Sequence, residues 1–131
     1  MRLFIVRHAE AAAGEPDDLR PLTGAGRETA RALGKQFAAD GVRPDAILTS
    51  PLLRARATAA EIARAVGMEA EPDERLAPGA GPDDVEAAVA GRGATVVVVG
   101  HQPDCGRIAA AFGDGREPAF PPGGVAVVEL P

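Results

Sequence analysis

The chain has 131 residues, of which 46% are hydrophobic and 25% are charged, and its formal net charge is −5. These values are typical of a globular domain with a buried core and exclude a disordered chain. The negative charge argues against a general nucleic-acid surface, and the absence of Tyr and Trp removes the usual base-stacking side chains.

Cysteine and histidine are scarce. The single cysteine, Cys105, excludes an internal disulfide, and together with only two histidines it argues against a structural zinc site. We therefore expect no metal and no cofactor, and we interpret Cys105 as a small buried residue. No apolar run approaches transmembrane length, and the N-terminus lacks a signal-peptide pattern. We expect a cytoplasmic protein that does not contact a membrane.

The first predicted element is a strand at residues 2–6, where L-F-I-V shows no polar alternation. Such a run is typical of a strand covered on both faces, and these strands are mostly parallel and central. A loop that contains Gly and Pro follows over residues 9–21. Thr23 is a suitable N-cap for a helix that runs to about Ala39, and A-I-L-T at 46–49 predicts a second strand.

Ser50 and Pro51 predict the start of the next helix, because Ser is a favoured N-cap and Pro suits the first helical position. We expect this helix to end at Gly67, and the Pro- and Gly-rich residues 69–82 to form a surface excursion. The remaining predicted elements are a helix at 83–90, a strand at 94–99, a helix from Pro103 to about Phe112, and a strand at 125–130 on the sheet edge. This alternation predicts one α/β domain over residues 1–131.

Four polar side chains follow the predicted strands closely. Arg7 and His8 come directly after the first strand, and His101 follows V-V-V-V-G. Arg54 lies in the first turn of the helix that follows the second strand. Ligands of open α/β sheets bind beyond the carboxyl ends of the strands, so we expect these residues to converge. An arginine beside a helix N-terminus is repelled by the helix dipole unless an anion lies between them. The pattern therefore predicts a site for a dianion such as phosphate.

An imidazole held among arginines can attack phosphorus and form a phosphohistidine, which water then hydrolyses. The planar guanidinium bonds two phosphoryl oxygens at once and stabilises the charge of the transferring group, by about 3–4 kcal/mol for each well-placed donor. Because guanidinium groups can supply the charge that Mg²⁺ supplies elsewhere, we expect this chemistry to need no metal.

Four segments resemble blocks of the histidine phosphatase superfamily. R-H-A-E (7–10) is similar to its R-H-G motif, and R-P-L-T-x-x-G (20–26) to its next block. S-P-L-L-R-A-R-A-T-A (50–59) resembles its S-P-x-x-R-A-x-x-T block, and V-G-H-Q-P (99–103) the block with the second histidine. These blocks span nearly the whole chain in the family's order.

The resemblance implies a phosphoglycerate mutase-like fold, a three-layer sandwich with a mostly parallel central sheet and helices on both faces. It implies His8 as the phosphoryl acceptor, with Arg7, Arg54 and His101 as phosphate ligands. The short length and the R-P-L-T block look most like the small SixA-type phosphohistidine phosphatases. We therefore expect dephosphorylation of phosphohistidine on a signalling protein by a monomeric enzyme.

The chain departs from the family pattern at two places. Ala9 replaces the usual Gly, which is tolerable if the backbone there does not need a positive φ. Larger members use a Glu in an acidic loop as proton donor, and Glu74 occupies a similar place here; Glu10, Asp17 and Asp18 are competing candidates. A phosphohistidine substrate lessens the need for this acid, because a protonated imidazole is already a good leaving group.

Several alternatives remain at this point. Arg20 is either an ordinary loop charge or a rim contact to phosphate, and Arg56 is a surface residue that could contact a substrate protein. Ser50 is interpreted as a helix cap, because no general base for it is evident. The first rival function is the same chemistry on small phosphomonoesters. The second is a non-catalytic phosphate-binding module in signalling.

Overall fold

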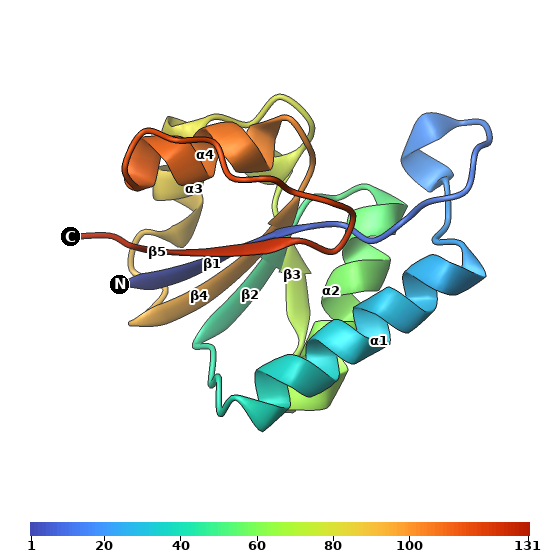
Figure 1. The fold of residues 1–131 in the computed structure, drawn as a ribbon, viewed down its shortest axis with the longest axis horizontal. Coiled ribbons are helices and arrows are strands. Elements are labelled where there is room, and N and C mark those ends of the chain that lie inside the picture. The colour runs from blue at the N-terminus through green and yellow to red at the C-terminus, as the bar shows by residue number, and fades with distance from the viewer.

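A five-stranded sheet forms the centre of the computed structural model, which describes residues 1–131 (Figure 1). The strand order is β3-β2-β4-β1-β5, and the bounds are β1 Arg2–Arg7, β2 Ala46–Thr49, β3 Ala70–Pro72, β4 Thr95–Gly100 and β5 Val125–Glu129. The pairs β1–β4, β2–β4 and β2–β3 are parallel, and β5 runs antiparallel to β1. The mostly parallel sheet and the edge position of the last strand are confirmed.

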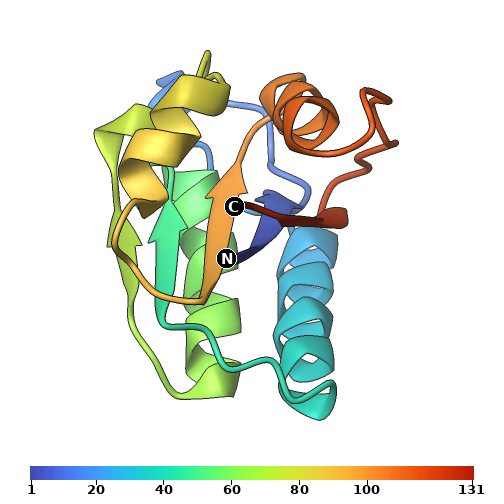
Figure 2. The ribbon, with the colours of Figure 1, turned by 90° about the vertical axis from the view of Figure 1, so that its left-hand side faces the viewer.

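Helices cover both faces of this sheet, as Figures 1 and 2 show. The helices are α1 Gly24–Ala39, α2 Leu53–Val66, α3 Pro82–Val89 and α4 Asp104–Phe112. One apolar cluster joins the sheet to α1 and α2, and a second joins its other face to α3 and α4. The central strands β1 and β4 lie between the two clusters, which explains why their sequences are apolar without alternation. The predicted three-layer α/β fold is confirmed.

Thr23 caps α1 as predicted, since its side chain accepts a hydrogen bond from Gly26 N. Gly26 itself lies against the backbone of Glu10, and a Cβ at this position would overlap the carbonyl oxygen of Glu10. The glycine of the R-P-L-T-x-x-G block thus lets the first turn of α1 pack against the chain just after His8. The two segments hold each other in place.

The start of α2 differs from the prediction. The helix begins at Leu53 with Leu52 as N-cap, so Ser50 is not the cap and Pro51 is not the first helical residue. The Ser50 side chain does accept a hydrogen bond from Leu52 N, at 3.2 Å, but it does so in the turn before the helix. Arg54 remains in the first turn of α2, as expected.

Residues 69–82 are more ordered than a surface excursion. They contain β3, which pairs with the edge of β2, and a short 3-10 helix, η2 (Glu74–Leu76), whose Leu76 is buried in the core. A-E-P has little strand character, so β3 forms because the neighbouring β2 offers an unpaired edge. A second 3-10 helix, η1 (Asp17–Leu19), interrupts the predicted loop at 9–21. No helix of the protein combines the length and the apolar character that crossing a membrane requires.

Candidate active site

His8 is held by backbone contacts at the carboxyl edge of the sheet. Its N–H donates to Gly100 O at 3.0 Å, and its carbonyl oxygen accepts from Gly123 N at 3.1 Å. Its side-chain Nδ1 lies 2.7 Å from Ala9 O. A carbonyl oxygen can only accept, so Nδ1 carries the proton and Nε2 keeps a free lone pair. Nε2 is therefore the atom of His8 that is free to act as a nucleophile.

Ala9 occupies its position without backbone strain. It is fully buried, and no residue of the chain other than glycine has a positive φ. Its N–H donates to Thr58 Oγ1 at 3.0 Å, and the Thr58 hydroxyl donates to Arg54 O at 2.9 Å. Thr58 therefore couples the loop that carries His8 to the first turn of α2. Alanine can replace the family's glycine here because the backbone does not need the left-handed region.

Arg7 and Arg54 point into the same region from different elements. Arg7 is the last residue of β1 and donates through Nη1 to Phe120 O at 2.8 Å, while its Nε is buried without a partner. Arg54 is 7% exposed and donates to Asp17 through both terminal nitrogens, to the backbone oxygen at 2.9 Å and to the carboxylate at 3.3 Å. The carboxylate of Asp17 offsets part of the cost of placing a guanidinium at a helix N-terminus.

His101 follows β4, the strand beside β1, and is 5% exposed. Its ring centroid lies 5.2 Å from that of His8. Nε2 is 2.7 Å from Ser50 Oγ, and Nδ1 is buried without a hydrogen-bond partner.

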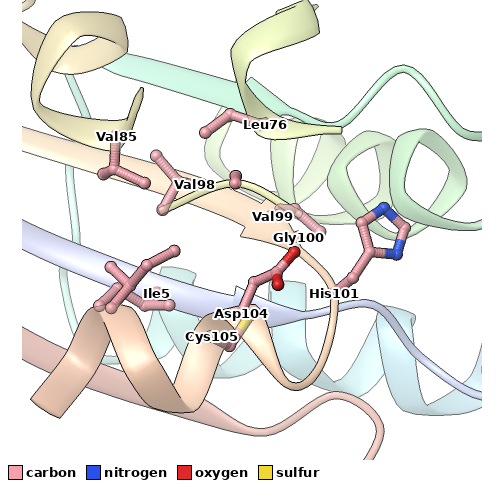
Figure 3. A pocket seen from close by; sticks show the side chains of 11 residues that line it. Ile5, Leu76, Val85, Val98, Val99, Gly100, His101, Asp104 and Cys105 are labelled. Atoms are coloured by element: carbon pink, nitrogen blue, oxygen red, sulfur yellow. The ribbon is translucent and has the colours of Figure 1, made fainter. Parts of the chain in front are cut away.

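An apolar cavity lies beside His101 between the sheet and α4, and the two ring nitrogens of His101 point away from it (Figure 3). Cys105 lines this cavity, and burial raises its pKa to about 12, so the thiol is inert.

Both imidazoles are neutral at pH 7. Burial lowers the pKa of His101 to about 4, with repulsion from His8 and Arg54 acting in the same direction. Burial also lowers the pKa of His8, and the nearby arginines add to this effect, although the hydrogen bond to Ala9 O opposes it. A neutral His8 at neutral pH has the lone pair that nucleophilic attack requires.

The low pKa of His101 predicts a loss of stability in mild acid. The unfolded chain takes up the proton near pH 6.5 and the folded chain near pH 4, so the free energy of unfolding falls as the pH drops between these values. At about 1.4 kcal/mol per pH unit, the contribution is at most about 3–4 kcal/mol. We expect urea unfolding in phosphate-free buffer at pH 7 and pH 4.5 to show a smaller pH effect for His101→Gln than for wild type. An equal pH effect in both proteins would contradict the assignment.

Arg20 extends the cationic region through Asp17. It donates to Asp17 Oδ1 at 3.0 Å and to Ala12 O at 2.8 Å, so Asp17 bridges Arg20 and Arg54. The hydrogen bond from Arg20, with further contributions from Arg54, lowers the pKa of Asp17. Asp17 therefore stays ionised at neutral pH, which argues against it as the proton donor. Arg20 and Arg54 contact the same carboxylate group, that of Asp17. This position would allow Arg20 to contact phosphate at the rim of the site.

Glu74 lies on the same edge of the sheet. It is the first residue of η2, two residues beyond the end of β3, and it is exposed. Its neighbour Asp73 caps η2, and hydrogen bonds from Arg75 lower the pKa of that carboxyl group. Among the other candidates, Glu10 accepts from the Thr23 hydroxyl at 2.8 Å, and Asp18 is exposed beside Asp17. Glu74 as proton donor stays a prediction.

A family model for the histidine phosphatase superfamily (branch 1) matches residues 3–78. The chain belongs to this superfamily. An uncharacterized protein of Picosynechococcus is 38% identical over 88% of this chain and 75% of its own length. The phosphohistidine phosphatase SixA of Escherichia coli is 32% identical over 90% of this chain and 78% of its own. A solved structure of the protein histidine phosphatase SixA complexed with tungstate superimposes with a TM-score of 0.90 at 32% identity, covering 99% of this chain and 88% of that one.

This histidine phosphatase domain is SixA-like, with the phosphoglycerate mutase-like fold that the four blocks imply. The fold brings the predicted residues Arg7, His8, Arg54 and His101 to one edge of the sheet. Asp17, Thr58 and Ser50 make contacts that support these four residues, and the sequence did not predict those contacts. The spacing of Thr58 four residues after Arg54 was a usable signal, because residues at this spacing share one face of a helix. Nothing in the sequence indicated that Asp17 would contact Arg54.

Proposed function

We propose that this protein is a metal-independent phosphatase that acts through a covalent phospho-His8 intermediate. The observation that carries the proposal is the pair of buried side-chain atoms that lack a hydrogen-bond partner. Both belong to this site, Arg7 Nε and His101 Nδ1. Buried polar groups are nearly always paired, so Arg7 Nε and His101 Nδ1, the latter in its N–H form, call for an anionic ligand beside His8. A phosphoryl group supplies acceptor oxygens for both.

In the proposed reaction, the Nε2 lone pair of His8 attacks phosphorus in line with the leaving group. The N–P bond forms while the bond to the leaving group breaks, and the leaving group takes a proton from the predicted donor Glu74 or from water. Water then attacks the phosphohistidine, releases inorganic phosphate and restores neutral His8. Arg7, Arg54 and His101 hold the phosphoryl oxygens and stabilise the charge that develops on them. The similarity to a SixA complexed with tungstate, itself a tetrahedral oxyanion, supports oxyanion binding by this protein as well.

We propose phosphohistidine on a protein as the substrate. The similarity to SixA supports this choice. The exposed Glu74 supports it as well, because a loosely placed acid suits a leaving group that departs as a neutral imidazole after protonation. We further propose that the protein works as a monomer on a signalling partner in the cytoplasm.

Turnover of matched substrates tests the substrate class. We expect release of phosphate from a phosphohistidine-bearing protein at a kcat/KM well above that for sugar phosphates and nucleotide monophosphates. Higher kcat/KM on the small monoesters, with none on phosphohistidine protein, would assign the enzyme to those substrates instead. Saturable phosphate binding without turnover of any substrate would indicate a binding module.

Leu19 distinguishes a protein substrate from a small one. Its side chain is 58% exposed on η1, two residues from Asp17, which contacts Arg54. A protein that carries the phosphohistidine would cover this side chain when it docks at the proposed site, whereas a small substrate would not. We expect Leu19→Ser to raise KM for a phosphohistidine-bearing protein several-fold and to leave the hydrolysis of phosphoramidate unchanged. Val127→Ser, at a 51% exposed position on the edge strand β5, is the control and should change neither. Equal effects of Leu19→Ser on both substrates would count against a docking role.

A further inference from the structure

Ser50 is fully buried in the turn between β2 and α2, and it contacts neighbouring elements on two sides. Its backbone N–H donates to Val99 O at 2.9 Å, which fixes it against β4. Its Oγ lies 2.7 Å from His101 Nε2 and accepts from Leu52 N at 3.2 Å. The hydroxyl is therefore held between the start of α2 and the second histidine of the site.

The donors and acceptors around Ser50 Oγ determine whether the hydroxyl or the imidazole donates the hydrogen bond between Ser50 and His101. A serine hydroxyl has one hydrogen to donate and can accept two bonds. If Nε2 of His101 donated to Ser50 Oγ, the hydroxyl hydrogen would be buried with no acceptor, because Nε2 and Leu52 N are the only partners of Oγ. If the hydroxyl donates to Nε2 and accepts from Leu52, both contacts of Oγ are satisfied and only His101 Nδ1–H is left without a partner, whereas the first arrangement leaves both the hydroxyl hydrogen and the Nδ1 lone pair unpaired. Buried polar groups strongly favour the second arrangement.

In this arrangement Nε2 of His101 is the acceptor, so the proton of the neutral ring is on Nδ1. Nδ1 is the buried nitrogen without a partner, and it points away from the apolar cavity (Figure 3). The opposite tautomer would present a lone pair to a phosphoryl oxygen and repel it. Since His101 is neutral at pH 7, only the tautomer decides whether the ring offers a donor or a lone pair.

We propose that Ser50 is a positioning residue, which holds His101 in the Nδ1–H tautomer and so presents a hydrogen-bond donor to the phosphoryl group. The identity of the anion in this inference rests on the proposed function. The tautomer of His101 does not, because it follows from the hydrogen bonds of Ser50. Ser50 itself does not touch the substrate. Its effect passes through the imidazole, in the way that a buried carboxylate or carbonyl fixes the tautomer of a catalytic histidine in other enzymes.

Imidazole ¹⁵N NMR tests the tautomer directly, because the chain has only two histidines and His101→Gln assigns them. In wild type at pH 7 without phosphate, we expect His101 as the Nδ1–H form. In Ser50→Ala, we expect a mixture of both tautomers and about tenfold weaker inhibition by inorganic phosphate, the effect of one hydrogen bond to an anion. Ser50→Cys, with a weaker donor of similar shape, should fall between the two.

Thr49→Val is the matched control. Thr49 is buried next to Ser50, and its hydroxyl donates to Ser50 O without contacting His101. We expect Thr49→Val to keep the wild-type tautomer and phosphate inhibition even if it lowers stability. An Nε2–H form in wild type would overturn the proposal and needs no variant. So would an unchanged tautomer and phosphate affinity in folded Ser50→Ala. If only the phosphatase proposal were wrong, wild type would show the Nδ1–H form of His101 by NMR but would turn over none of the phosphorylated substrates.

Discussion

His8→Ala is expected to abolish covalent labelling and to lower kcat by at least about a thousandfold, because the variant lacks the atom that attacks phosphorus in the proposed reaction. Rapid quenching of wild type with ³²P-labelled phosphoramidate should trap a protein-bound label that is lost in acid and stable in base, as a phosphorus–nitrogen bond requires. The variant should still bind inorganic phosphate, since Arg7, Arg54 and His101 remain. Loss of turnover with retained phosphate binding would separate the nucleophile from the anion ligands.

His101→Gln provides the comparison for this experiment. The ring centroids of His101 and His8 lie 5.2 Å apart. In the proposed reaction, however, His101 binds a phosphoryl oxygen and does not attack phosphorus. We therefore expect His101→Gln to react more slowly than wild type and still to acquire the label. Labelling that persists in His8→Ala and disappears in His101→Gln would show that the roles of the two histidines are reversed. A wild type that turns over substrate without any label would point to direct attack by water.

Arg54→Ala is expected to lower kcat/KM by about a hundredfold to a thousandfold and to weaken inhibition by vanadate strongly. Arg54 is 7% exposed at the start of α2, where its guanidinium and the helix N-terminus attract the same anion. The substitution also leaves Asp17 without its buried partner, which adds an uncompensated negative charge near the phosphoryl group. Both changes act against binding of a dianion.

Arg56→Ala is the matched control for this substitution. Arg56 lies two residues further along the same helix and carries the same charge, but it is exposed and makes no ion pair. Removing it should change kcat/KM for phosphoramidate and inhibition by vanadate by less than about twofold, because exposed charges are screened. Similar losses in both variants would mean that net charge, rather than the placement of Arg54, governs phosphate affinity.

Asp17 explains how the protein tolerates a nearly buried guanidinium at a helix N-terminus. The side chain of Asp17 bridges Arg54 and Arg20, and its backbone oxygen accepts a further bond from Arg54. The 3-10 helix η1 thus supplies both a counter-charge and an orientation for the arginine. A phosphoryl dianion would share the guanidinium with this carboxylate. The remaining N–H groups of Arg54 allow this, since a guanidinium has five donors.

The amino-acid sequence alone determined the α/β class, the extent of most helices and strands, and the four residues Arg7, His8, Arg54 and His101. These features follow from local rules. An apolar run without alternation requires cover on both faces, and parallel strands place their carboxyl ends, with the polar residues that follow them, at one edge of the sheet. The last strand was likewise placed at the sheet edge, but its antiparallel direction and its alternating burial come from the structure.

Only the tertiary structure decided the start of α2, the existence of β3 and the partners of the site residues. The local sequence predicts Ser50 as a helix cap, but Ser50 lies in the turn before the helix. There its hydroxyl contacts His101, which is 51 residues away in the sequence. A-E-P becomes a strand only because β2 leaves an edge unpaired beside it. Contacts of this kind join segments that are distant in sequence, and local propensities carry no information about them.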